Sequence, residues 1–114
     1  IVVDRRGTGD IVTSCGTIQP FCDIRYGQFF EKVANDAGLT GWKCTAGGSS
    51  DTRIWASQGI QSVNLSVGYQ FEHTADEILD TDACYKTVQL IKAVLSQSRD
   101  LSRTLRSLRR TDAI

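Results

Sequence analysis

The chain has 114 residues, which is enough for one domain and too few for two. Hydrophobic residues make up 40% of it and charged residues 23%, a composition that excludes a disordered chain. Thirteen basic residues balance thirteen acidic ones, so no net charge attracts the chain to nucleic acid or to a membrane surface. No apolar run approaches the roughly 20 residues that cross a bilayer, and no signal peptide is recognisable. We therefore expect a cytoplasmic protein, with neither a membrane nor nucleic acid among its partners.

The chain opens on an apolar run at residues 1–3, which predicts a strand already under way and hence an incomplete domain. The polar segment 4–9 closes this strand and puts Asp4 at its carboxyl end. Residues 10–15 alternate weakly and are rich in β-branched side chains, which is compatible with a second strand or with an extended loop. Residues 16–23 hold the only proline and are expected to form a loop.

An amphipathic helix is predicted to begin near Ile24 and to stop at Gly38. Its apolar side chains recur at steps of three and four residues: Phe29, Phe30, Val33, Ala34 and Ala37. A candidate strand at residues 42–45 follows, and then a glycine- and serine-rich loop at residues 46–51.

Asp51 is expected to begin a short helix in which Ile54 and Trp55 face inward. After this helix, Ser62 opens a buried strand that runs into a loop carrying the only histidine, His73. Chemistry on this chain is most readily expected in that loop, because imidazole is a common metal ligand and proton carrier.

Acidic residues next predict the start of a long helix at residues 80–82, where the helix dipole favours them. One apolar stripe on it comprises Cys84, Val88, Ile91 and Leu95, and a second, which runs further, comprises Ala83, Leu90, Val94, Leu101, Leu105 and Leu108. Strands and helices that alternate in this way predict an α/β fold: a three-layer sandwich with a mostly parallel sheet flanked by helices.

The four cysteines are irregularly spaced and contain no Cys-x-x-Cys pair: Cys15, Cys22, Cys44 and Cys84. With a single histidine in the chain they cannot complete a zinc knuckle. We interpret them as small buried hydrophobic residues in a reducing compartment. A disulfide between Cys15 and Cys22 remains the alternative.

Three candidate sites follow predicted strands: Asp4, the loop at residues 47–51, and His73. Ligands of open α/β sheets bind outside the carboxyl ends of the strands, where such loops converge. Each candidate also has a plain structural interpretation. Aspartate commonly forms turns, a loop histidine commonly makes only hydrogen bonds, and the glycine-rich loop lacks the lysine of a phosphate-binding loop.

The order of these pieces resembles the carboxy-terminal half of the catalytic domain of co-catalytic zinc peptidases, the aminopeptidase and carboxypeptidase-like families. The sharpest matches are the loop Gly47-Gly48-Ser49-Ser50-Asp51, the strand Gly59-Ile60-Gln61-Ser62-Val63 and the loop His73-Thr74-Ala75-Asp76-Glu77. The resemblance covers residues 1–95 and leaves residues 96–114 as an amphipathic, basic helical tail.

The resemblance implies that Asp4 and His73 are zinc ligands of a two-metal site, in which the metals polarise a peptide carbonyl and activate water. It also implies a substrate contact or a loop-ordering role for Asp51, and Arg53 is a candidate partner for a substrate carboxylate, with a surface salt bridge as the alternative. The chain departs from the family at Ala75, where proline is usual, and in a glycine-rich loop that is one residue longer.

The family's first histidine, its bridging aspartate and its Glu-Glu pair are absent from these residues. We therefore expect the chain to be part of a zinc-dependent exopeptidase acting on peptide substrates. An upstream portion of the same protein or another subunit would supply the remaining ligands and the general base.

The tail leaves a second function open. Arginines share one helical face, Arg99, Arg103, Arg106 and Arg110, and leucines lie opposite them. Such a helix packs on its own domain, docks on another subunit or binds an anionic surface. Docking on another subunit would make the chain an inert assembly module. We expect a homo-oligomer.

Overall fold

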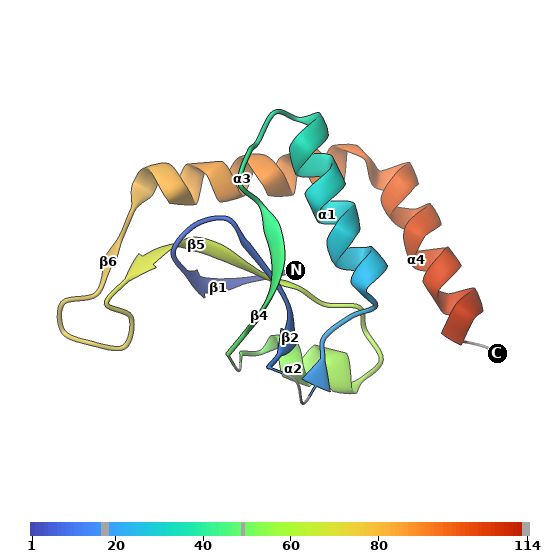
Figure 1. Cartoon of the computed structure of the whole chain (residues 1–114), viewed down its shortest axis with the longest axis horizontal. Helices are drawn as coiled ribbons and strands as arrows, with labels where there is room; N and C mark the ends of the chain where they lie inside the picture. The colour runs from blue at the N-terminus through green and yellow to red at the C-terminus, as the bar shows by residue number, and fades with distance from the viewer. Residues whose placement is uncertain (17–18, 49, 113–114) are drawn as a thin grey trace.

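The computed structural model describes residues 1–16, 19–48 and 50–112, except for the side chains of residues 19 and 109–112. In these residues six strands form one sheet: β1 (Val2–Arg6), β2 (Asp10–Cys15), β3 (Gln19–Pro20), β4 (Lys43–Gly47), β5 (Asn64–Gln70) and β6 (Ile78–Leu79). The helices are α1 (Ile24–Asp36), α2 (Thr52–Ser57), α3 (Thr81–Ser96) and α4 (Ser98–Asp112) (Figure 1). Within that part of the chain, none of the helices has the length and apolar character needed to span a bilayer.

The four longer strands lie in the order β4, β2, β5, β1, and the sheet is mixed. β1 pairs in parallel with β5, and β2 pairs in parallel with β4, but β2 and β5 run antiparallel. The α/β class is confirmed, whereas a mostly parallel sheet is not. The physical reason is the short turn between β1 and β2, which reverses the chain and is far too short for the crossover that parallel strands require.

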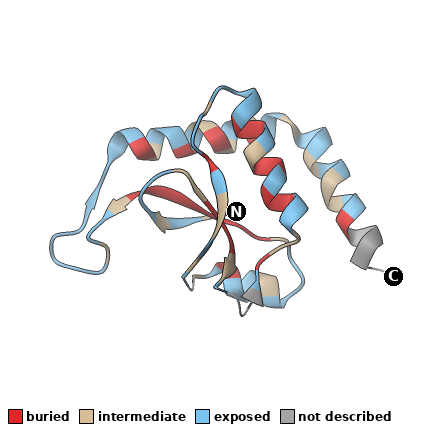
Figure 2. Cartoon of the chain, viewed as in Figure 1, coloured by how far each residue is buried: buried red, intermediate tan, exposed pale blue. Residues whose placement is uncertain are grey.

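One face of the sheet carries the hydrophobic core. α1 and α3 pack on each other and on β2 and β5, and α4 packs on both helices. Figure 2 shows the buried residues along these elements. The largest fully buried side chains of this core are Phe30, Ile11, Leu65, Leu90, Leu108, Val33, Val63 and Val94. The predicted third layer, helices on the other face, is not found among the described residues.

A polar side chain covers part of that second face. Val12, which alternation points away from the core residue Ile11, is nonetheless fully buried. A methyl group built on Gly47 would lie 2.8 Å from Val12 Cγ1 and 3.0 Å from Arg5 Nη1, so the guanidinium lies over the two residues. Arg5 Nε lies 3.2 Å from Asp10 Oδ2, which holds the arginine in this position.

The predicted helix limits are confirmed where local signals set them. The carboxylate of Asp23 accepts a hydrogen bond from the backbone N–H of Arg25 at the start of α1, and Gly38 follows its end with a φ of 74°. Asp80 Oδ1 accepts from the N–H groups of residues 82 and 83 at the start of α3.

The predicted burial of α2 is wrong. Ile54 and Trp55 are 55% and 50% exposed, and Thr52 is its buried residue. The reason is position: α2 lies past the end of β4, away from the helices that cover the core (Figure 1).

The leucine face of the tail is covered by the chain itself. Leu108 is 2% exposed, and Leu101 and Leu105 pack against the same core. Of the three interpretations of the tail, the structure therefore has the helix packed on its own domain. Arg99, Arg103 and Arg106 are exposed, and the predicted arginine face extends to Arg110, whose side chain is outside the described part.

Candidate functional site

Asp4 lies within β1 and not, as predicted, after it. Its backbone N–H donates to the side-chain Oδ1 of the buried Asn64 at 2.8 Å, and Gly7 N–H donates to the Tyr69 carbonyl at 3.0 Å. These bonds to β5 carry the pairing past Asp4, so β1 continues to Arg6. The Asp4 side chain is exposed and therefore accessible to a ligand.

His73 lies in the loop between β5 and β6 and has a left-handed backbone, with a φ of 64°. Phe71 shares this conformation, with a φ of 56°. Thr74 stabilises the turn, because its hydroxyl donates to the Phe71 carbonyl at 2.6 Å and accepts from the Asp76 N–H at 3.2 Å. Such backbone costs on the order of 1–2 kcal/mol per residue outside glycine and is concentrated at functional sites. The imidazole is exposed.

A pocket of about 670 Å³ lies where β1 and β5 end. Two segments and one aspartate line it: Arg5, Arg6, Gly7, Thr8, Asp10, Tyr69, Gln70, Phe71 and Glu72. Asp4 directly precedes the first segment and His73 directly follows the second. The two predicted ligands therefore adjoin, in sequence, the two segments that line the pocket. The parallel pairing of β1 with β5 brings these segments together.

The charges of this pocket are paired across its walls. Arg5 and Asp10 lie 3.2 Å apart, and Arg6 Nε lies 3.8 Å from Glu72 Oε1. If one of these ion pairs opens, its arginine can bind the carboxylate of a zwitterionic ligand and its acid can bind the amino group. Sequence reasoning missed these four residues, and the available signal was the pair of arginines directly after Asp4.

Asp51 and Arg53 lie at the other end of the sheet. β4 runs antiparallel to β5, so the loop that follows β4 lies at the end of the sheet where β5 starts (Figure 1). His73 follows the last residue of β5 and so belongs to the opposite end. The predicted convergence of this loop with His73 is therefore wrong. Asp51 precedes the first turn of α2 and makes no side-chain capping bond, and both side chains are exposed.

The donors present fit part of a zinc site. A carboxylate and a neutral imidazole are suitable zinc ligands, and both are accessible here. If they bound one ion, they would supply two of the four donors of a tetrahedral site, and within the residues described no group of three or more His, Cys, Asp or Glu side chains could hold a metal ion. A complete site needs donors from outside this set.

Two of the four cysteines are poor sources of such donors. All four are free thiols. Burial raises the pKa of Cys22 to about 11 and that of Cys44 to about 12, where a hydrogen bond with Glu31 adds to the effect. A metal binds the thiolate, so these two side chains are poor ligands at neutral pH. Burial likewise raises the pKa of Tyr26 to about 12, in the core under α4.

The fold and the pocket define an α/β domain with one helical layer and a pocket of charged and aromatic side chains at the shared end of two parallel strands. The chain is similar to an uncharacterized protein, YqjE of Bacillus subtilis (strain 168), with 34% identity over 68 residues. The match includes 60% of this chain and 18% of YqjE, so the chain spans under a fifth of that relative. No protein-family model and no solved structure matches the chain.

Proposed function

We propose that this chain is part of a zinc-dependent exopeptidase, aminopeptidase-like, to which it contributes Asp4 and His73 as metal ligands. One observation carries the proposal: the two residues flank, in sequence, the two segments that line the pocket at the end of β1 and β5. The order of the sequence motifs and the left-handed backbone of His73 support it further.

The remaining donors and the general base would come from an upstream portion of the same protein or from another subunit. Bound zinc would polarise the scissile carbonyl and lower the pKa of a water molecule. The chain's own residues would hold the substrate, with Arg5 or Arg6 binding a carboxylate and Asp10 or Glu72 an amino group. The substrate contacts of Asp51 and Arg53 remain a prediction, which their position at the other end of the sheet does not favour. The free thiols support a reducing compartment, and we include a cytoplasmic location in the proposal.

The test uses the full-length protein that contains this chain. We expect it to bind zinc and to release amino-terminal residues from peptides, and we expect a chelator to abolish the activity. Asp4→Asn and His73→Gln should each weaken zinc binding by at least about 10–100-fold, the loss found even for groups that only orient ligands. Asp76→Asn, an exposed acid in the His73 loop, is the matched control and should bind zinc normally.

Zinc content and peptide hydrolysis are both measured, because each could fail separately. Activity that survives complete metal removal would end the proposal. Full zinc content in the Asp4→Asn and His73→Gln proteins would remove these residues from the site even if the enzyme proves metal-dependent.

The packing of the tail does not favour the alternative, an inert assembly module attached through the tail. That function requires Leu101, Leu105 and Leu108 to be available to another subunit, whereas Leu108 is buried in the core of this chain and Leu101 and Leu105 are partly buried against it.

A further inference from the structure

α3 carries a second apolar stripe that the domain leaves uncovered. Ala83, Leu90 and Val94 face the core and are at most 5% exposed. On the opposite side, Tyr85 is 63% exposed, Val88 41% and Leu95 57%. These three residues are spaced by three and seven positions, so they form one line along the helix. We call this line the outer stripe of α3.

The outer stripe is complementary to itself in an antiparallel arrangement. Tyr85 and Leu95 are equally far from the level of Leu90, and so are Val88 and the exposed Lys92. When two copies of α3 pack antiparallel, Tyr85 of each meets Leu95 of the other. Val88 then meets the methylene stem of Lys92, whose ammonium group stays in water. Isologous contact of this kind closes a two-fold dimer.

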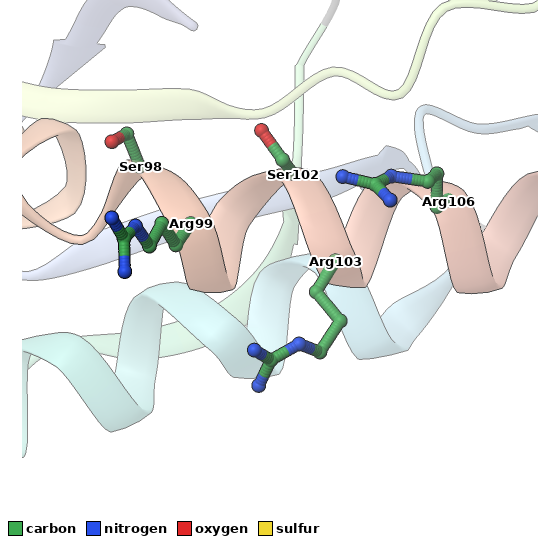
Figure 3. Close-up of a pocket in the computed structure, with 5 residues that line it drawn as sticks. All are labelled: Ser98, Arg99, Ser102, Arg103 and Arg106. Carbon is green, nitrogen blue, oxygen red and sulfur yellow. The ribbon is translucent and has the colours of Figure 1, made fainter.

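The charges at the two ends of α3 select the same direction. Exposed acids surround its amino end: Asp76, Glu77, Asp80 and Asp82. Exposed arginines follow its carboxyl end on α4, Arg99, Arg103 and Arg106, and line a groove of about 380 Å³ with Ser98 and Ser102 (Figure 3). An antiparallel pair sets the acidic end of each copy against the basic end of the other, and it also opposes the two helix dipoles. A parallel pair would set like charges together.

We propose that α3 is a self-association surface, through which two copies of this chain form a two-fold dimer with antiparallel helices. This inference is independent of the zinc site, because the outer stripe contains no residue of the pocket at β1 and β5.

The oligomeric state of the full-length protein tests the proposal. We expect sedimentation to show a dimer at about 100 μM that dissociates on dilution, more readily at high salt. Val88→Glu and Leu95→Glu each bury two charges per dimer and should raise the dissociation constant at least about tenfold. Ile54→Glu, on the equally exposed α2, is the matched control and should leave it unchanged.

Circular dichroism and thermal unfolding establish that each variant is folded, and Leu95→Ser provides a milder second variant. A monomer at every concentration, or a dimer that both glutamate variants leave intact, would overturn the proposal. A monomer in which Val88→Glu lowers the thermal stability would instead assign the outer stripe to another part of the same protein, and would equally overturn it.

The direction of the helices is tested separately by cross-linking. In a mixture of Tyr85→Cys and Leu95→Cys proteins, mild oxidation should join the two variants to each other more than it joins either variant to itself. The unchanged protein, with its four natural cysteines, gives the background. Preferential cross-linking of each variant to itself would establish a parallel pair and overturn the proposed geometry.

Discussion

Asp23 stabilises the first turn of α1 through its carboxylate. One oxygen accepts from the Arg25 backbone N–H at 2.9 Å, and the guanidinium of Arg25 donates to both oxygens at 3.0 and 2.8 Å. Asp23→Ala should therefore lower the free energy of unfolding by about 1 kcal/mol, the usual cost of a lost helix cap. Urea unfolding near pH 7 measures this difference.

The same contact has a defined pH dependence. The hydrogen bonds from Arg25 lower the pKa of Asp23 from its ordinary value of 3.8 to about 2. The unfolded chain therefore takes up the proton first, and the stabilisation is complete above about pH 4 and is lost as the pH falls toward 2. The difference between the natural protein and Asp23→Ala should shrink over that interval. Asp23→Asn keeps a capping oxygen and should lose less stability than Asp23→Ala. A stability difference between the natural protein and Asp23→Ala that stays constant down to pH 2 would contradict the assignment.

At the scale of elements, α3 is fixed to the sheet at an irregularity of β5. Between two pairs with β1, Arg5 with Ser66 and Arg6 with Tyr69, β5 has more residues than β1. Gly68 lies in this bulge with a φ of 101°, and a methyl group there would lie 2.7 Å from the Asp80 carbonyl oxygen. The first turn of α3 can approach the strand this closely because residue 68 has no side chain.

Thr87 completes this attachment and provides an element-scale prediction. Its buried hydroxyl lies 2.6 Å from the Ser66 carbonyl oxygen, to which it donates. Thr87→Val keeps the shape of the side chain but removes the donor, so we expect a loss of about 1–3 kcal/mol in thermal or urea unfolding. Thr104→Val is the matched control, since its hydroxyl donates to the Asp100 carbonyl on the helix surface. Equal effects of the two substitutions would show that the link between α3 and β5 contributes nothing.

The elements themselves could be predicted because their signals are local. The caps at Asp23 and Asp80, the stop at Gly38 and the spacing of apolar residues lie within a few positions of the boundaries they set. Burial of α2 could not be predicted in this way, because Ile54 and Trp55 form an apolar pair whether or not an element lies beside them.

At the scale of the whole molecule, strand direction and sheet coverage decide where the candidate site lies. Both are non-local: Ile11 pairs with Leu65, and Asp4 is kept within β1 by Asn64. The motifs selected Asp4 and His73 as candidates without this information, and the parallel pairing of β1 and β5 brings the segments next to them in sequence to one pocket. The loop at residues 47–51 had an equally clear motif but follows a strand of the opposite direction, so sequence order alone could not exclude it from the same end.

The tail is part of this single fold, and Leu108 tests that conclusion. Its side chain is 2% exposed, within the core that α1, α3 and α4 share with the sheet. Leu108→Ala should lower the free energy of unfolding by about 2–5 kcal/mol, because it leaves a cavity that the surrounding helices fill only in part. Arg106→Ala, an exposed position on the same helix, should change stability by no more than about 0.5 kcal/mol. If both variants unfold like the natural protein, the leucine face is not buried in its own domain, and a role for the tail in assembly would regain its basis.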